Sequence, residues 1–359
     1  MILLLACFDA RAAEVASIAL KGLDKPILVD LGGFAQPRFD VVQADADAGT
    51  DGTIGFALDR ARLSVGVRLD DDHIVYEQQI SVELYRQPQL MDAWADFGVT
   101  QVHLRVGQMK VPSTRASLCP DAQVLLPWQP LGLGWGGKRD VGAEVIGRVG
   151  PVIYTVGAFD GEGTNVTGNA GRGLLYEGRV VVGLTGAPAK ITELMPSTAE
   201  PEVTIGVSGH RNLTGEVGSR TAILGGNADV FVHAGPVTGQ VEVVGNHVNN
   251  EDATAADYDQ LGGYGQVAVL VPSGRLQDHL AGIVRFEIGD AAAGVPPVDA
   301  LDENEGTWRL ETGIGLYGGA PLFRNLNNAR VFIGYRVDHE TEGAPLRDDA
   351  FTIASTVAF

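Results

Sequence analysis

The amino-acid sequence predicts an all-β fold, a transmembrane antiparallel β-barrel of about 16 strands. Three observations lead to this prediction. Apolar and polar residues alternate along most of the chain, no internal stretch approaches the roughly 20 apolar residues of a spanning helix, and the last segment alternates as well. In that segment Phe351, Ile353, Val357 and Phe359 share one strand face, which Ser355 interrupts. A soluble protein would expose this apolar edge to water, whereas the closing strand of an outer-membrane barrel turns it toward lipid.

The composition agrees with one large barrel. The 359 residues include 48 glycines, and the mean hydropathy is only +0.08. A membrane protein of this composition must place its apolar residues at every second strand position, as a barrel does. The formal net charge is −19. Such a charge repels phosphates, so a nucleic-acid partner is not expected.

The sequence also predicts how the chain is divided. We expect a shortened signal peptide in residues 1–13, a short N-terminal segment in residues 14–30 and the barrel domain in residues 31–359. The first residues have a short apolar core and an Ala10-Arg11-Ala12 sequence that resembles a signal-peptidase site, but they lack a basic region. The residues before Cys7 also resemble a short lipoprotein box. If the leader is removed, Cys119 has no partner for a disulfide.

Six segments show the alternation most clearly. They are residues 59–69, 102–107, 140–149, 280–288, 308–316 and 330–338. In the first of them, Leu63 and Val65 oppose Arg60 and Arg62. A soluble sandwich would also alternate, but its polar face would carry Lys, Thr and Glu toward bulk water. A polar face that mixes arginines with acidic residues fits the wet lumen of a barrel.

The connections between the expected strands alternate in length. Short turns such as residues 99–100 and 150–151 are expected at the periplasmic rim, and longer acidic loops such as residues 44–53, 160–172 and 289–306 at the outer rim. One periplasmic connection, residues 186–202, is longer than this rule predicts, and nothing in its sequence accounts for it. The third outer loop, residues 111–138, contains Leu125, Leu126, Trp128 and Trp135. Because an exposed apolar loop is unfavourable, we expect this loop to fold into the barrel.

Several stretches resemble the phosphate-selective porin family (porins O and P) of Gram-negative outer membranes. They are GFAQPRF at residues 33–39, LDRARL at 58–63, DAWADF at 92–97, LRVGQMKVP at 104–112, RDVG at 139–142 and GAFDGEG at 157–163. These motifs lie in the N-terminal half, and the strand number and terminal aromatic extend the resemblance to the end. It implies trimers of sixteen-stranded barrels in which the third outer loop folds inward and narrows the pore.

The resemblance also implies a set of pore-lining residues. Arg60 and Arg62 match the paired arginines of the family's second strand, and Arg38 matches one in the first strand. The predicted anion track continues at polar strand positions with Arg68, Arg105, Arg148, Arg179, Arg285, Arg309 and Arg336. The predicted constriction loop contributes Arg115, Trp128, Trp135, Lys138 and Arg139. The lysine cluster that the family places at the constriction is largely missing, which argues against phosphate specificity.

Two interpretations of these arginines stay open at this point. A track of cations would lower the barrier for anions, since rings of charge set the selectivity of pores. Alternatively each arginine pairs with a neighbouring acid and stiffens the wall through charge-assisted hydrogen bonds. The candidate partners are Glu83, Asp96, Glu144, Glu177, Glu287 and Glu311. A lumen with arginines on one wall and acids on the other satisfies both interpretations.

The sequence nominates no catalytic residue, no metal site and no cofactor, so we do not expect an enzyme. The seven histidines include no pair at i and i+4, and Ser208 lacks the flanking pattern of a nucleophile elbow. The stretch GLGWGGK at residues 132–138 resembles a P-loop, but Arg139 stands where Ser or Thr is needed. The acidic residues Asp45, Asp47 and Asp51 lack the bidentate Glu of a calcium loop.

The predicted function is therefore passive diffusion of small hydrophilic solutes across a Gram-negative outer membrane, with a preference for anions such as phosphate. The alternatives are a plugged structural or adhesive barrel whose acidic outer loops bind a partner, and a soluble β-sandwich. The predicted partners are the solutes or anions themselves, outer-membrane lipid and lipopolysaccharide, the barrel-assembly machinery through Phe359, and two further copies of the chain in a homotrimer.

Overall fold

The structure is a computed structural model of the whole chain. It describes residues 13–18, 27–43, 52–70, 75–85, 87–99, 101–128, 130, 139–166, 168–169, 173–189, 191–215, 220–251, 257–293, 306–318, 329–340 and 349–358. Among these residues, no helix has both the length and the apolar character that a membrane crossing requires.

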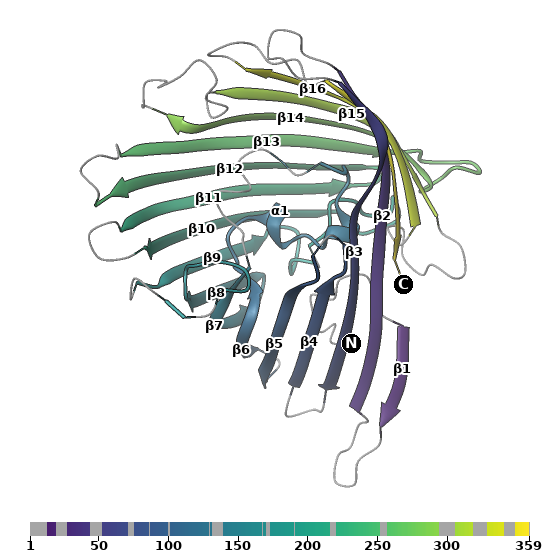
Figure 1. Cartoon of the computed structure of the whole chain (residues 1–359). Coiled ribbons are helices and arrows are strands. Elements are labelled where there is room, and N and C mark those ends of the chain that lie inside the picture. Colours follow the sequence, from purple (N-terminus) through teal and green to yellow (C-terminus); the bar gives the residue numbers. More distant parts are fainter. Residues whose placement is uncertain are drawn as a thin grey trace.

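Antiparallel strands make up nearly all of the regular structure (Figure 1). They are β1 (Ala13–Ile18), β2 (Ile27–Val42), β3 (Thr53–Asp70), β4 (Val75–Glu83), β5 (Gln89–Val99), β6 (Val102–Lys110), β7 (Arg139–Val149), β8 (Val152–Phe159), β9 (Leu175–Gly183), β10 (Glu202–Thr214), β11 (Thr221–Ala234), β12 (Val237–Asn250), β13 (Tyr258–Leu270), β14 (Leu280–Ala293), β15 (Thr307–Tyr317), β16 (Ala329–Glu340) and β17 (Ala350–Ala358). Between β6 and β7 lie the short helix α1 (Arg115–Leu118) and a 3₁₀ turn (Asp121–Gln123).

The strands from β2 to β17 close into a ring of sixteen, because each pairs with its neighbour in sequence and β17 pairs with β2. The predicted strand number is therefore confirmed. Strand β1 lies outside the ring. It pairs with the first part of β2, from Ile27 to Leu31, whereas β17 pairs with the later part, from Phe34 to Val42. The shorter β17 does not reach the first residues of β2, and β1 pairs with their backbone groups instead.

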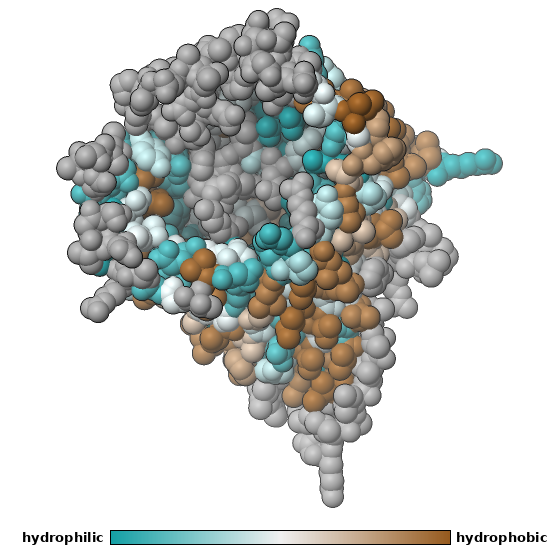
Figure 2. All heavy atoms as spheres, viewed as in Figure 1, coloured by the Kyte–Doolittle hydropathy of each residue, from teal (hydrophilic) through white to brown (hydrophobic). Residues whose placement is uncertain are grey.

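The outer wall of the ring is apolar, as the alternation predicts. In β17, Phe351, Ile353 and Val357 are exposed, while the intervening Ala350, Thr352, Ala354, Thr356 and Ala358 are buried. Phe359 lies outside the described residues. Exposed Val, Leu, Ile and Phe side chains recur at alternate positions on most other strands, and Figure 2 shows them as brown areas on the outer surface. In water such a surface would be unfavourable, so this belt and the closed ring place the barrel in an outer membrane.

The start of the barrel differs from the sequence prediction. We expected the barrel domain to begin at residue 31, but β2 begins at Ile27 and its residues Leu28 and Asp30 already pair with β3. The expected N-terminal segment, residues 14–30, therefore contains most of β1 and the beginning of β2. The sequence did not reveal this because the stretch is too short to show the period of two. The predicted signal peptide lies outside the described residues except for Ala13, and it stays a prediction.

Two connections fold into the ring from opposite rims. The loop between β6 and β7 enters from one rim, and Figure 1 shows α1 within the barrel. The connection between β9 and β10, residues 184–201, leaves the other rim and carries the buried residues Glu193 and Leu194. We call these the inward loop (residues 111–138, described to 128 and at 130) and the inner connection (residues 184–201). They meet inside the barrel and divide its interior.

Candidate functional site

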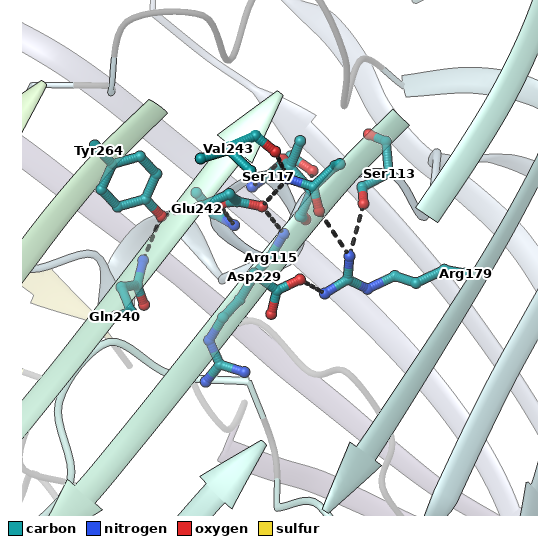
Figure 3. Close-up of polar contacts among 12 residues, drawn as sticks. Ser113, Arg115, Ser117, Arg179, Asp229, Gln240, Glu242, Val243 and Tyr264 are labelled. Atoms are coloured by element: carbon teal, nitrogen blue, oxygen red, sulfur yellow. Dashed lines mark hydrogen bonds and ion pairs between the residues drawn. The ribbon is translucent and has the colours of Figure 1, made fainter. Parts of the chain in front are cut away.

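The inward loop is fastened to the far wall of the barrel by a buried carboxylate. Thr114 caps α1 by accepting a hydrogen bond from the Ser117 amide at 3.0 Å. The Glu242 carboxylate on β12 accepts hydrogen bonds from the backbone amides of Arg115 at 2.6 Å and Ala116 at 3.0 Å (Figure 3). Tyr264 donates its hydroxyl to the same carboxylate at 2.9 Å. The predicted inward fold of this loop is confirmed, and Glu242 anchors its helix α1 to β12.

The side chain of Arg115 continues away from this network. Its guanidinium lies 3.9 Å from the ring centroid of Phe231 and donates to the Thr192 carbonyl oxygen at 3.2 Å. Burial lowers the pKa of Arg115, although nearby Asp229 opposes the shift. Arg115 therefore links the inward loop to both the wall and the inner connection, through a ring face and a neutral carbonyl group.

The inner connection makes a second contact with the inward loop. Glu193 accepts a hydrogen bond from the backbone amide of Leu125, and Leu194 is buried beside Leu125 and Trp128. The same apolar cluster includes Ile283, Tyr317 and Phe332 on the inner wall of β14 to β16. Trp128 packs edge-on against Phe332 with 5.7 Å between ring centroids, and its carbonyl oxygen accepts from Arg285 at 2.7 Å. Apolar packing thus fills the lumen beside β13 to β17, where a barrel interior is usually polar.

The open part of the lumen lies on the opposite side, along β4 to β9. A cavity of about 290 Å³ is bounded there by the inner faces of these strands, the start of the inward loop and the inner connection. Five Lys and Arg residues line it, namely Lys110, Arg105, Arg115, Arg148 and Arg179, together with four acids, Glu77, Asp92, Asp96 and Glu144. A second cavity of about 90 Å³ lies on the other side of the inward loop, and Lys110 lines both.

The ten predicted track arginines are largely neutralised by the wall. Nine of them lie within 4.0 Å of a carboxylate: Arg38 with Asp40 and Asp59, Arg60 and Arg62 with Asp121, Arg68 with Asp30, Arg105 with Asp96 and Glu144, Arg179 with Asp229, Arg285 with Glu287 and Glu311, Arg309 with Asp338, and Arg336 with Asp338. Arg148 instead donates to the Pro188 carbonyl oxygen at 3.1 Å. The second interpretation, pairing with acids, therefore describes most of these side chains, and their role in conduction stays a prediction.

The predicted constriction residues are brought together only in part. Arg115 and Trp128 lie inside the barrel, as expected. Arg139 stands at the start of β7 and pairs with Asp92 at 2.9 Å. Trp135 and Lys138 lie outside the described residues.

Asp121 is a central residue that the sequence analysis missed. It lies in the 3₁₀ turn of the inward loop and contacts Arg60 at 3.0 Å and Arg62 at 2.8 Å. Burial alone would raise its pKa, but Arg60, Lys110, Arg62 and Arg139 together hold that pKa well below its ordinary value. Asp121 is thus an anion at physiological pH. The sequence showed an acidic residue in an apolar loop, but only folding brings it to β3.

Lys110 was also missed, although it lies within a stretch that carries the family resemblance. Its ammonium group donates to the Cys119 carbonyl oxygen at 2.9 Å. Within the described part of the chain, Lys110, Arg115 and Arg148 form no ion pair with a carboxylate, whereas Arg105 and Arg179 do. These three are the cavity-lining Lys and Arg side chains that no carboxylate of the described residues contacts within 4.0 Å, although Asp121 attracts Lys110 and Asp229 attracts Arg115 from farther away.

Removing the Glu242 carboxylate should release the inward loop. In a Glu242→Ala variant the Arg115 and Ala116 amides lose their acceptor, at a cost of about 1–3 kcal/mol for each unsatisfied group. We expect trypsin to cleave the folded protein after Arg115, which the wild-type protein buries. Glu242→Gln keeps one of the two acceptor oxygens and replaces the other with an NH2 donor, so it should give an intermediate rate of cleavage. Equal resistance of the wild-type and Ala proteins would contradict this anchoring role.

No protein-family model matches the chain, and no curated protein matches its sequence. Solved structures do resemble it. The outer-membrane channel DcaP of Acinetobacter baumannii has a TM-score of 0.66 at 11% identity, with 96% of this chain and 100% of that chain covered. An anion-selective porin from Comamonas acidovorans has a TM-score of 0.65 at 10% identity, covering 93% of this chain and 100% of that one. An in-vitro folded OmpT of Vibrio cholerae, described as a trimer form, has a TM-score of 0.61 at 12% identity, covering 93% and 99%.

The chain has the fold of an outer-membrane porin. At these identities the likeness extends to the fold alone, and it reaches over nearly the whole of each chain. The predicted all-β transmembrane barrel is confirmed. The narrower resemblance to phosphate-selective porins finds no counterpart among these structures.

Proposed function

We propose that this protein is an outer-membrane porin through which small hydrophilic solutes diffuse passively. The observation that carries this proposal is the cavity of about 290 Å³, lined by charged and apolar side chains, inside a barrel whose outer wall is apolar. The similarity in fold to structures described as a channel and as an anion-selective porin supports it. Diffusion requires no catalytic group, metal or cofactor, and the proposal includes none.

The proposed preference for anions depends on fewer residues than the sequence suggested. Ion pairs neutralise most of the arginine track, so the track by itself gives little selectivity. Lys110, Arg115 and Arg148 line the cavity without a carboxylate partner among the described residues. Charged groups that line a narrow pore set its selectivity, and we assign the anion preference to these three. Phosphate is one of the small anions that this pore would pass. In its described part the pore has no dedicated lysine cluster that would make it specific for phosphate.

Conductance in planar bilayers tests the proposal. The purified full-length protein should form channels in potassium chloride, and under asymmetric salt the reversal potential should have the sign of an anion-preferring pore. Absence of conductance would contradict the pore, and a cation preference would contradict the assigned selectivity.

Lys110→Gln should reduce the anion preference without closing the pore. Lys110 lines both cavities, so loss of its charge changes the field along the solute path. We expect the anion-to-cation permeability ratio to fall severalfold, within about tenfold, the factor that corresponds to 1.4 kcal/mol. Arg275→Gln is the control, because Arg275 is exposed on the turn after β13. An unchanged ratio in Lys110→Gln would remove Lys110 from the proposed selectivity.

The runner-up function is a plugged structural or adhesive barrel. The specific observation that favours it is the meeting of the inward loop and the inner connection within the lumen, through Glu193 and Leu125. Swelling of liposomes in isotonic solutions of small sugars separates the two functions. A porin admits the sugars and the liposomes swell, whereas a plugged barrel admits none.

We further propose that three copies assemble in the membrane, in contact with outer-membrane lipid and lipopolysaccharide, after insertion by the barrel-assembly machinery. The trimer form of a protein with this fold supports the assembly. Chemical cross-linking in intact outer membranes tests it, and a monomer band alone would contradict it.

A further inference from the structure

The inner faces of β7, β8 and β9 carry apolar side chains where a lumen is expected to be polar. Ile153 on β8 is the register partner of both Arg148 on β7 and Val181 on β9. These three side chains therefore form one row across the inner wall, and all three line the main cavity. Outward positions of the same strands, such as Val145 and Val156, are exposed toward lipid, so the row belongs to the inner face.

The inner connection completes this surface. Pro188 and Ile191 of the inner connection line the same cavity, with Pro188 beside Arg148, and Ile146 on β7 lines it as well. We call Ile146, Ile153, Val181, Pro188 and Ile191 the apolar shelf. The shelf residues of the strands are partly exposed to the lumen and not packed away. A purely hydrophilic solute gains nothing from such a surface, whereas an apolar group of a solute is drawn to it.

Arg148 provides the charged end of the site. Its guanidinium has five N–H donors in a fixed fork, and within the described residues the hydrogen bond to the Pro188 carbonyl oxygen is the one that engages them. It forms no ion pair with a carboxylate in the described ranges of the chain. The four acids that line the cavity lie elsewhere on its wall, and Asp92, Asp96 and Glu144 are already paired with Arg139 and Arg105. A planar carboxylate fits the free donors of a guanidinium better than a spherical anion does.

We propose that Arg148 and the apolar shelf form a binding site for small organic carboxylates with an apolar body, of the size and chemistry of an aromatic monocarboxylate. The carboxylate lies against Arg148 and the apolar body against Ile153 and Val181. The inference rests on the proposed porin function, since it names the class of solute that this channel holds on its way. Inorganic anions lack the apolar body and pass without being retained.

Calorimetric titration of the detergent-purified full chain with benzoate tests the site. We expect saturable binding of benzoate, with benzamide and acetate each binding at least about tenfold more weakly, because one lacks the charge and the other the apolar body. Arg148→Gln should weaken benzoate binding by about 10-fold or more. Ile153→Asn tests the shelf separately and should weaken benzoate while leaving acetate unchanged. Arg275→Gln should bind benzoate as the wild-type protein does.

The outcomes separate this inference from the proposed function. Channels that conduct potassium chloride but bind benzoate no better than benzamide or phosphate would overturn the site and leave the porin in place. Benzoate binding that depends on Arg148, in a protein that forms no channels, would uphold the site and overturn the porin. Unchanged affinity in both Arg148→Gln and Ile153→Asn, with heat-modifiable mobility showing folded barrels, would also overturn the site.

Discussion

Replacing residues 187–199 with a tight turn is expected to raise the single-channel conductance roughly twofold or more. The inner connection occupies part of the lumen, where Glu193 and Leu194 are buried. Its removal leaves the strands intact, because Gly183 and Thr204 at the ends of β9 and β10 are already register partners and a short hairpin can join them. The measurement is conductance in planar bilayers at a fixed salt concentration.

The same deletion should also loosen the inward loop. The Leu125 amide loses its acceptor on Glu193 and the apolar cluster loses Leu194. We therefore expect more current noise in the shortened protein than in the wild type. Shortening the exposed turn at residues 272–276 is the control, since that segment lies outside the lumen cavities. If both deletions leave the conductance at the wild-type value, the inner connection does not restrict the solute path.

Asp121→Asn is expected to increase anion preference more than any other single substitution considered. Asp121 neutralises Arg60 and Arg62 directly, and Lys110 and Arg139 lie close enough to lower its pKa. Loss of its charge makes this cluster, which already holds more cations than acids, still more cationic beside the second cavity. A unit charge at such a partly buried position is worth several kcal/mol before screening, so the permeability ratio for chloride over potassium should rise by about tenfold.

The pH dependence of this effect follows from the depressed pKa of Asp121. Burial opposes the depression, but the four cations outweigh it. Ion selectivity depends on the charge that Asp121 carries in the folded protein, and this carboxylate stays ionised until the pH falls through its lowered pKa. The difference in selectivity between the wild-type protein and Asp121→Asn should therefore be constant between about pH 5 and 8 and should shrink only below about pH 4.

A charge-matched control distinguishes this local effect from a change in net charge. Asp259 is exposed and pairs with His247 near the end of β12. Asp259→Asn removes the same charge without touching the lumen, so its permeability ratio should equal that of the wild-type protein. Similar shifts in both variants would indicate a general surface-charge effect and would contradict the role of Asp121.

The alternation of the sequence was sufficient to predict the barrel and the membrane. Leu63 and Val65 face outward while Arg62 is buried, as the period of two requires. The inward loop was also predictable, because Leu125, Leu126 and Trp128 need an apolar environment that only the interior offers. These are local properties, in which each residue carries its own preference for lipid, water or a packed core.

The inner connection was visible in the sequence only as an unexplained length. Its residues Glu193 and Leu194 give no sign that they enter the lumen, since their partners Leu125 and Trp128 lie far away along the chain. The arginines illustrate the same limit. A strand position shows that Arg285 faces inward, but its pairing with Glu287 and Glu311 and its contact with the Trp128 carbonyl group depend on the packed barrel.

The sequence by itself determined the fold class, the strand number, the faces of the strands and the inward third loop, because periodicity and local hydropathy decide them. Only the tertiary structure decided which arginines pair directly with a carboxylate, where the lumen is filled and where the cavity remains. Charge compensation and packing depend on distances between segments that the ring closure brings together, and a linear pattern does not contain those distances. For this reason the cations that carry the proposed selectivity are Lys110, Arg115 and Arg148, of which the predicted arginine track contained only Arg148.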